Sequence, residues 1–148
     1  MVAELKVPDE TVGYLVAMVR RRLNLLYSEA LRPLRLTTRQ YGVLSRLWRE
    51  DSQTVDALVA ALYTDQSSLS RVLHRMVKAK LVTRRPDPED RRARRISLTP
   101  KGRGLERPVN KLRDQVERRM LAGLSHGEIE RIQGGLRQLL ANLSETKS

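Results

Sequence analysis

Short polar and basic side chains lie along one side of a helix that the sequence predicts from about Asp65 to Lys80. Apolar residues recur there every three or four positions, which predicts an inward stripe of Leu69, Val72, Leu73, Met76 and Val77. The side chains left for the outer face are Gln66, Ser67, Ser68, Ser70, Arg71, His74 and Arg75. Such hydroxyl, amide and guanidinium groups can bond to base edges and phosphates when a helix lies in a major groove. Taken alone, the same face is also what an ordinary solvated helix presents.

A second basic cluster lies in a loop between two short β-branched segments, 81–85 and 95–98. The loop is highly charged and contains two prolines, which predicts the tip of a β-hairpin. Its arginines are Arg91, Arg92, Arg94 and Arg95. Their mutual repulsion favours a bound anion, and an arginine at such a tip can enter a narrow minor groove. We expect Asp90 to hold one guanidinium in a bidentate pair, although the cluster alone could be a solvated run of charge.

The distribution of charge indicates what kind of partner this segment would bind. The 148 residues carry 29 Lys and Arg against 17 Asp and Glu, a formal net charge of +12. Residues 65–103 hold 12 basic and 4 acidic residues, a net charge of +8. The remaining 109 residues hold 17 basic and 13 acidic residues, a net charge of +4. Such clustering is typical of a nucleic-acid-binding face, although an acidic protein or an anionic membrane surface would also be attracted. No apolar run approaches the roughly 20 residues of a membrane span.

The elements that would position these two clusters are mostly helical. An apolar stripe predicts a long first helix over residues 9–31, which Pro33 ends because the residue before a proline disfavours the helical conformation. Three short helices are expected next, with N-caps at Thr37, at Thr54, and at Thr64 or Asp65. The last two of these have the spacing of a helix-turn-helix. Gln40 follows Thr37 at the third helical position, which predicts a capping box.

Two further helices are expected after the hairpin. Thr99 followed by a proline predicts the start of a long one, which Gly123 ends. Ser125 and Glu128 form a capping box for the last. The predicted fold is mainly α with a small β-hairpin wing. It is a single domain in which a winged helix-turn-helix core, about 36–98, is flanked by helices over 9–31 and 99–143.

The helices at the two ends of the chain have apolar stripes that one small winged core would not fully cover. They could pack on their own core in a monomer, but wrapping around a second copy would bury both stripes. A two-fold axis would then place two recognition helices about 34 Å apart, one turn of duplex. We therefore expect a homodimer.

Residues for catalysis and metal binding are missing from the sequence. The chain has no cysteine, which excludes a disulfide framework, a cysteine-ligated metal and a thiol redox sensor. His74 and His126 are far apart, and there is no phosphate loop or His–carboxylate–nucleophile set. We expect no enzyme activity, no metal and no cofactor. Residues 1–10 contain three acidic residues and no apolar run, which predicts a cytoplasmic protein without a signal peptide.

Three blocks of the sequence, at matching spacing, resemble the MarR family of transcription regulators. They are LTTRQYGVL (36–44), DQSSLSRVL (65–73), and PEDRRAR (88–94) with ISLTPKG (96–102). The resemblance extends over nearly the whole chain. It implies a homodimer whose first and last two helices form the dimerisation domain, with one winged helix per subunit and a palindromic operator on double-stranded DNA. In the family's wing pattern Asp-x-Arg, Arg92 is the residue for the minor groove and Asp90 is its partner.

The resemblance also implies a small aromatic or phenolic effector, bound between the dimer helices and the winged core. The chain has five aromatic residues, which are Tyr14, Tyr27, Tyr41, Trp48 and Tyr63. Each is interpreted first as a core or interface residue. Tyr27, Tyr41 and Trp48 are the candidates for contact with a ligand.

The sequence therefore predicts a sequence-specific DNA-binding regulator, a homodimeric repressor of a nearby operon that a small ligand releases from its operator. A nonspecific architectural DNA protein would share the charge without needing a patterned recognition helix, and a footprint would separate the two. An adaptor for an acidic protein or a membrane surface could use the same basic face. Its binding would persist when DNA is added as a competitor.

Overall fold

A computed structural model describes residues 11–144 of the chain. They form two compact units, and the boundary between Arg113 and Asp114 falls within one helix. The first unit contains α1 (Val12–Leu31), the 3-10 turn η2 (Arg32–Leu34), α2 (Thr38–Arg49), β1 (Gln53–Thr54), α3 (Val55–Ala61), α4 (Gln66–Lys78), β2 (Val82–Pro86), β3 (Arg94–Leu98) and α5 (Pro100–Gly104). Helix α6 (Glu106–Met120) crosses the boundary, and α7 (His126–Ser144) belongs to the second unit.

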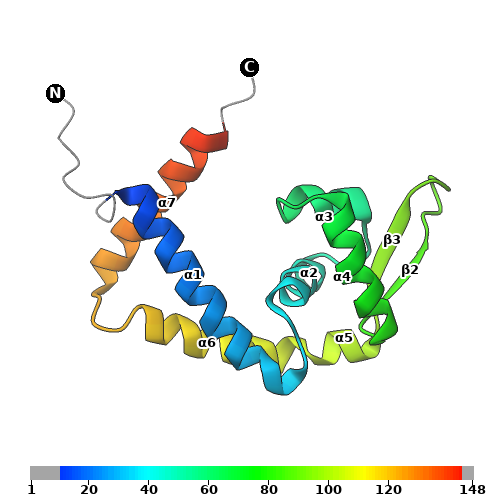
Figure 1. The fold of residues 1–148 in the computed structure, drawn as a ribbon, viewed down its shortest axis with the longest axis horizontal. Helices are drawn as coiled ribbons and strands as arrows, with labels where there is room; N and C mark the ends of the chain where they lie inside the picture. Colours follow the sequence, from blue (N-terminus) through cyan, green and yellow to red (C-terminus); the bar gives the residue numbers. More distant parts are fainter. Residues whose placement is uncertain (1–10, 145–148) are drawn as a thin grey trace. The chain divides into compact units, whose positions relative to one another are not determined.

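A three-stranded antiparallel sheet lies beside α4, with the strand order β1-β3-β2 (Figure 1). Strands β2 and β3 are the predicted hairpin, which we call the wing (residues 82–98). Its register pairs Val82 with Leu98 and Arg84 with Ile96. Strand β1, which pairs Gln53 with Ile96, was not predicted, because two residues are too few to show the alternation of a strand.

Polar caps fix the starts of the helices that carry the basic side chains. The Thr37 hydroxyl accepts the N–H of Gln40 at 3.2 Å, and the Gln40 side chain accepts the N–H of Thr37 at 3.0 Å. The predicted capping box is therefore confirmed. Asp65, and not Thr64, caps α4, because its Oδ1 accepts the N–H of Ser68 at 2.8 Å.

One hydrophobic core holds α2, α3, α4 and the sheet together. Its largest fully buried side chains include Leu44, Leu47, Leu58, Leu73, Met76 and Ile96. The predicted inward stripe of α4 is confirmed for Leu69, Leu73 and Met76, and Val72 is half-buried. Val77 is 38% exposed, because it lies about 80° around the helix axis from Leu69, at the edge of the stripe.

Two helix boundaries differ from the prediction. Helix α1 begins at Val12 with Thr11 as its extended N-cap, whereas the predicted start at residue 9 lies outside the described residues. The single helix predicted from Thr99 is divided into α5 and α6. Pro108 accounts for the division, because it has no N–H to donate to the carbonyl of Gly104 four residues earlier.

The second unit confirms two local predictions. Gly123 has φ +83°, a conformation that side chains disfavour, and it follows the end of α6. The N–H of Ser125 donates to the Glu128 carboxylate at 2.7 Å, and the Ser125 hydroxyl accepts the N–H of Glu128 at 3.3 Å, which completes the capping box.

Candidate nucleic-acid interface

Helix α4 presents the predicted polar face on the side away from its buried stripe. Its exposed members are Gln66, Ser67, Arg71, His74 and Arg75, whereas Ser68 and Ser70 are half-buried. The Ser68 hydroxyl donates to Asp65 Oδ2 at 2.7 Å and so reinforces the helix cap. The backbone N–H of Ser68, followed by this hydroxyl, lowers the pKa of Asp65. Arg71 Nη2 lies 3.4 Å from the Ser67 hydroxyl oxygen, one turn away on the same face.

The turn of the wing is built around the buried carboxylate of Asp87, which is only 4% exposed. Its Oδ1 accepts the N–H groups of Glu89 and Asp90 at 2.8 and 3.3 Å. Its Oδ2 accepts Nε and Nη2 of Arg95 at 2.9 and 2.6 Å. The N–H of Glu89, and then the Arg95 guanidinium, hold the pKa of Asp87 below its usual value. Because Arg95 Nη1 also donates to the carbonyl of Ser52, the turn is tied to the residue before β1.

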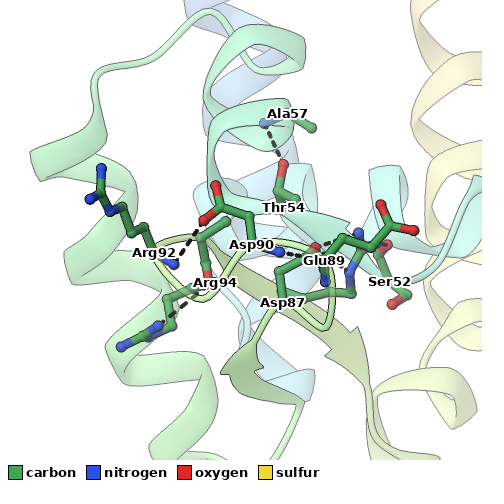
Figure 2. A network of polar contacts seen from close by, with 10 residues as sticks. Ser52, Thr54, Ala57, Asp87, Glu89, Asp90, Arg92 and Arg94 are labelled. Atoms are coloured by element: carbon green, nitrogen blue, oxygen red, sulfur yellow. Dashed lines mark hydrogen bonds and ion pairs between the residues drawn. The ribbon is translucent and has the colours of Figure 1, made fainter.

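The contacts of two wing residues differ from the prediction. Asp90 does not hold a guanidinium: its Oδ1 accepts the backbone N–H of Arg92 at 2.9 Å (Figure 2). A carboxylate two residues before an N–H can close such a turn without ordering a long side chain. In Figure 2 the Arg92 side chain extends away from the Asp90 carboxylate. Arg95 was predicted at the exposed tip, but it is half-buried on β3 and paired with Asp87.

Two surface hollows border the wing, one beside α4 and one beside the start of α3, and Arg84 lines both. The larger, about 450 Å³, is lined by Ser70, Arg71, His74, Arg75 and Arg84. The smaller, about 150 Å³, is lined by Thr54, Val55, Asp56, Gln66, Arg84, Arg92, Ala93 and Arg94. Arg84 was not among the predicted interface residues. The signal was available in strand alternation, because Arg84 shares a sheet face with Val82 and pairs with the buried Ile96.

The fold and the sequence both match one family of regulators. The MarR family profile matches residues 36–93. The organic hydroperoxide resistance transcriptional regulator of Bacillus subtilis is 33% identical over 94 residues, which are 64% of this chain and 64% of that protein. The reduced form of MarR from E. coli is 30% identical, with a TM-score of 0.78 over 88% of this chain and 96% of that one. This chain belongs to the MarR family.

Two further MarR-type structures resemble this MarR-family regulator. A mutant MarR from E. coli, complexed with operator DNA, is 28% identical with a TM-score of 0.82 over 87% of this chain and 93% of that one. BpsR of Bordetella bronchiseptica, whose DNA binding is regulated by 6-hydroxynicotinic acid, is 28% identical with a TM-score of 0.80 over 88% and 98%. The predicted family and the winged helix-turn-helix DNA-binding fold are therefore confirmed, and these relatives are transcription regulators rather than enzymes.

Three aromatic residues of this MarR-family chain, Tyr27, Tyr41 and Trp48, are partly buried against the hydrophobic core. Tyr27 and Tyr41 stack on each other, with ring centroids 5.4 Å apart. Trp48 Nε1 donates to the carbonyl of Gly102 at 3.0 Å. Tyr63 is 93% exposed in the turn between α3 and α4, so of its two interpretations, core or interface, the core is excluded.

A cavity of about 330 Å³ lies beside that turn. It is lined by Arg20, Arg39, Gly42, Val43, Leu62, Tyr63, Thr64, Ser68, Leu69 and Val72. Two arginines, from α1 and α2, give it positive charge, and the aliphatic side chains of Val43, Leu62, Leu69 and Val72 give it apolar surface. None of Tyr27, Tyr41 and Trp48 lines it.

Neither a metal cluster nor a membrane-crossing segment is found within residues 11–144. No three His, Cys, Asp or Glu side chains of this range are placed to share an ion. None of its helices combines the length and the apolar composition that crossing a bilayer requires. His74 is exposed on α4, and His126 lies 3.3 Å from the Glu130 carboxylate on α7.

Proposed function

We propose that this MarR-family regulator binds a palindromic operator as a homodimer, represses a nearby operon in the cytoplasm, and is released by a small ligand. One observation carries the proposal: the basic outer face of α4 and the wing border the same hollow, which Arg71, Arg75 and Arg84 line. With α4 in the major groove, Arg71 and Arg75 would reach guanine or phosphate, and Arg92 would reach the adjacent minor groove. The structure of a mutant E. coli MarR complexed with operator DNA supports operator DNA as the partner.

The predicted interface residues have different roles in this proposal. Gln66, Ser67, Ser70, Arg71, His74 and Arg75 would contact DNA from α4, and Arg91, Arg92 and Arg94 from the wing. Ser68 and Asp90 would act through the backbone, because each closes a local turn or cap. The buried Asp87 and its partner Arg95 would hold the wing in place for these contacts.

Dimerisation is supported by apolar faces that remain exposed in the single chain. In α1 they comprise Val12, Leu15, Val16 and Val19, and in α7 they comprise Ile132, Leu136, Leu139, Leu140 and Leu143, each more than a third exposed. Burying such faces against a second copy would remove apolar area from water. The two-fold axis of the dimer would match the symmetry of a palindromic operator.

Release by a ligand is supported by the 330 Å³ cavity, whose volume suits a small organic molecule. Arg20 and Arg39 would pair with a carboxylate, and Leu62 and Val72 would contact an aromatic ring. An aromatic anion is therefore the proposed effector class. The 6-hydroxynicotinic acid of BpsR is a member of that class.

Binding to the intergenic region upstream of the gene tests the proposal. The purified protein should protect an inverted repeat and bind it about 1,000-fold or more tightly than a shuffled duplex at physiological salt. The Arg92→Ala variant should bind the repeat about tenfold more weakly with an unchanged Tm. Arg85→Ala is the matched control, because Arg85 is an exposed arginine on the face of β2 opposite to Arg84 and the hollows. Equal affinity for both duplexes, with diffuse protection, would instead identify an architectural DNA protein.

A further inference from the structure

A third hollow, of about 410 Å³, lies between the first turn of α2 and the flank of α4. It is lined by Thr37, Thr38, Arg39, Gln40, Ser68, Arg71, Val72 and Arg75. Three of these residues are arginines and none is acidic. Arginines that line one hollow without a carboxylate repel one another, and an anion bound between them would be attracted by all three.

The local structure holds Arg39 firmly at this hollow. It is the second residue of α2, directly inside the capping box that joins Thr37 to Gln40. Gln40 is 8% exposed, so this helical turn is anchored to the core while Arg39 remains exposed. An arginine fork on a fixed turn is suited to a phosphate, whose oxygens it can bind in pairs.

The hollow lies on the flank of α4 opposite to the wing. Ser70 lines the wing-side hollow and Ser68 lines the α2-side hollow. Two residues along a helix are about 200° apart around its axis, so these serines mark nearly opposite flanks. Arg71 and Arg75, on the outer face between them, line both hollows.

A major groove has a phosphate backbone along each edge, and an α-helix fills the space between the edges. With α4 in the groove, Arg84 would face one edge and Arg39 the other. We propose that Arg39 binds a backbone phosphate on the groove edge facing α2, so that the interface includes α2 as well as α4 and the wing. This inference rests on the proposed function, in which α4 occupies the major groove.

A phosphate contact predicts a change in salt dependence that does not vary with sequence. Each phosphate contact contributes about −0.9 to the slope of log affinity against log salt concentration. Arg39→Gln removes two contacts per dimer, so the slope should become shallower by about 1.8, and binding at 0.1 M salt should weaken by up to about 60-fold. The operator and a shuffled duplex should lose the same factor.

The experiment measures the affinity of the full-length dimer for DNA by titrations repeated from 50 to 200 mM salt. Two matched variants serve as controls. Arg49→Gln removes an exposed arginine from the last turn of the same helix, about 15 Å along the axis from Arg39, and should leave the slope unchanged. Arg39→Lys keeps the charge and should retain most of the slope while losing part of the affinity.

The outcomes separate this inference from the proposed function. If wild-type protein protects an operator but Arg39→Gln behaves like Arg49→Gln, the phosphate contact is refuted and the regulator remains. A loss confined to the operator would mean that Arg39 reads a base, which also overturns the proposal. Wild-type protein that fails to prefer any repeat would refute the proposed function itself. Thermal unfolding of each variant verifies the fold.

Discussion

Replacing Gly102 by alanine should destabilise the base of the wing. A Cβ at this position would lie 2.2 Å from the carbonyl oxygen of Leu81 and 3.2 Å from Cδ2 of Leu98. The obstructing oxygen belongs to the backbone and accepts both the N–H and the hydroxyl of Thr99, each at 3.1 Å. A shift of this oxygen would break its two hydrogen bonds with Thr99, the N-cap of α5. The carbonyl of Gly102 in turn accepts Trp48 Nε1, so a shift of α5 would also strain that bond.

The magnitude follows from these contacts. Overpacking in a close-packed region costs about 1–3 kcal/mol, and the bond from Trp48 contributes about 1 kcal/mol. The higher helix propensity of alanine offsets up to about 1 kcal/mol. We expect the Gly102→Ala variant to be less stable by about 1–3 kcal/mol, which lowers the Tm by about 3–10 °C for a chain of this size.

Circular dichroism during heating measures the effect. All variants are compared at one protein concentration, because the Tm of the proposed dimer would depend on concentration. Gly104→Ala is the matched control, since it lies two residues later in the same short helix and its added Cβ would meet nothing within 4 Å. That variant should be as stable as wild type or up to about 1 kcal/mol more stable. Equal stability of the two variants would refute the explanation that position 102 requires glycine because it lies so close to the Leu81 carbonyl.

Three further perturbations test the local structure that supports the interface. Thr37→Ala removes half of the capping box of α2 and should cost about 1 kcal/mol, read from the urea midpoint; an unchanged midpoint would contradict the capping role. Trp48→Phe leaves the carbonyl of Gly102 without its donor and should cost about 1–2 kcal/mol in the same assay, whereas no loss would show that water replaces the indole. Asp87 has a pKa below its ordinary value of 3.8 in the folded protein, so its contribution to stability is complete above about pH 4 and is lost as the pH falls through the folded pKa. The stability difference between wild type and Asp87→Asn should therefore narrow from pH 7 to pH 3, and a constant difference would contradict this assignment.

Features that depend on neighbouring residues could be predicted from the sequence. The stripe of α4, the capping box at Thr37 and the hairpin each involve residues within a few positions of one another, and hydrophobic periodicity or cap chemistry records them directly. Pro108 shows the limit of periodicity. The apolar stripe after Thr99 continues through Leu105, but the missing N–H of Pro108 still divides the helix.

Contacts between distant residues could not be read in the same way. Arg95 reaches the carbonyl of Ser52, 43 positions away, so its role in holding the wing leaves no local pattern. In the sequence it is one of four similar arginines, and only its pairing with the buried Asp87 separates it from the exposed Arg92. Arg39 was missed for the same reason, because its position beside α4 arises from tertiary packing. Arg84 differs from it, because the alternation of β2 places Arg84 on the same sheet face as the buried Val82.

Arg39 has a consequence for regulation, because it lines both the 330 Å³ cavity and the 410 Å³ hollow. One guanidinium cannot pair fully with a DNA phosphate and with an anionic ligand at the same time. A ligand in the cavity that draws Arg39 away would therefore weaken DNA binding without any movement of the subunits. By linkage, such a ligand can weaken DNA binding by no more than the factor that Arg39 contributes to the affinity, which is up to about 60-fold at 0.1 M salt. In the proposed dimer, release by a much larger factor would require the ligand to change the spacing of the two recognition helices as well.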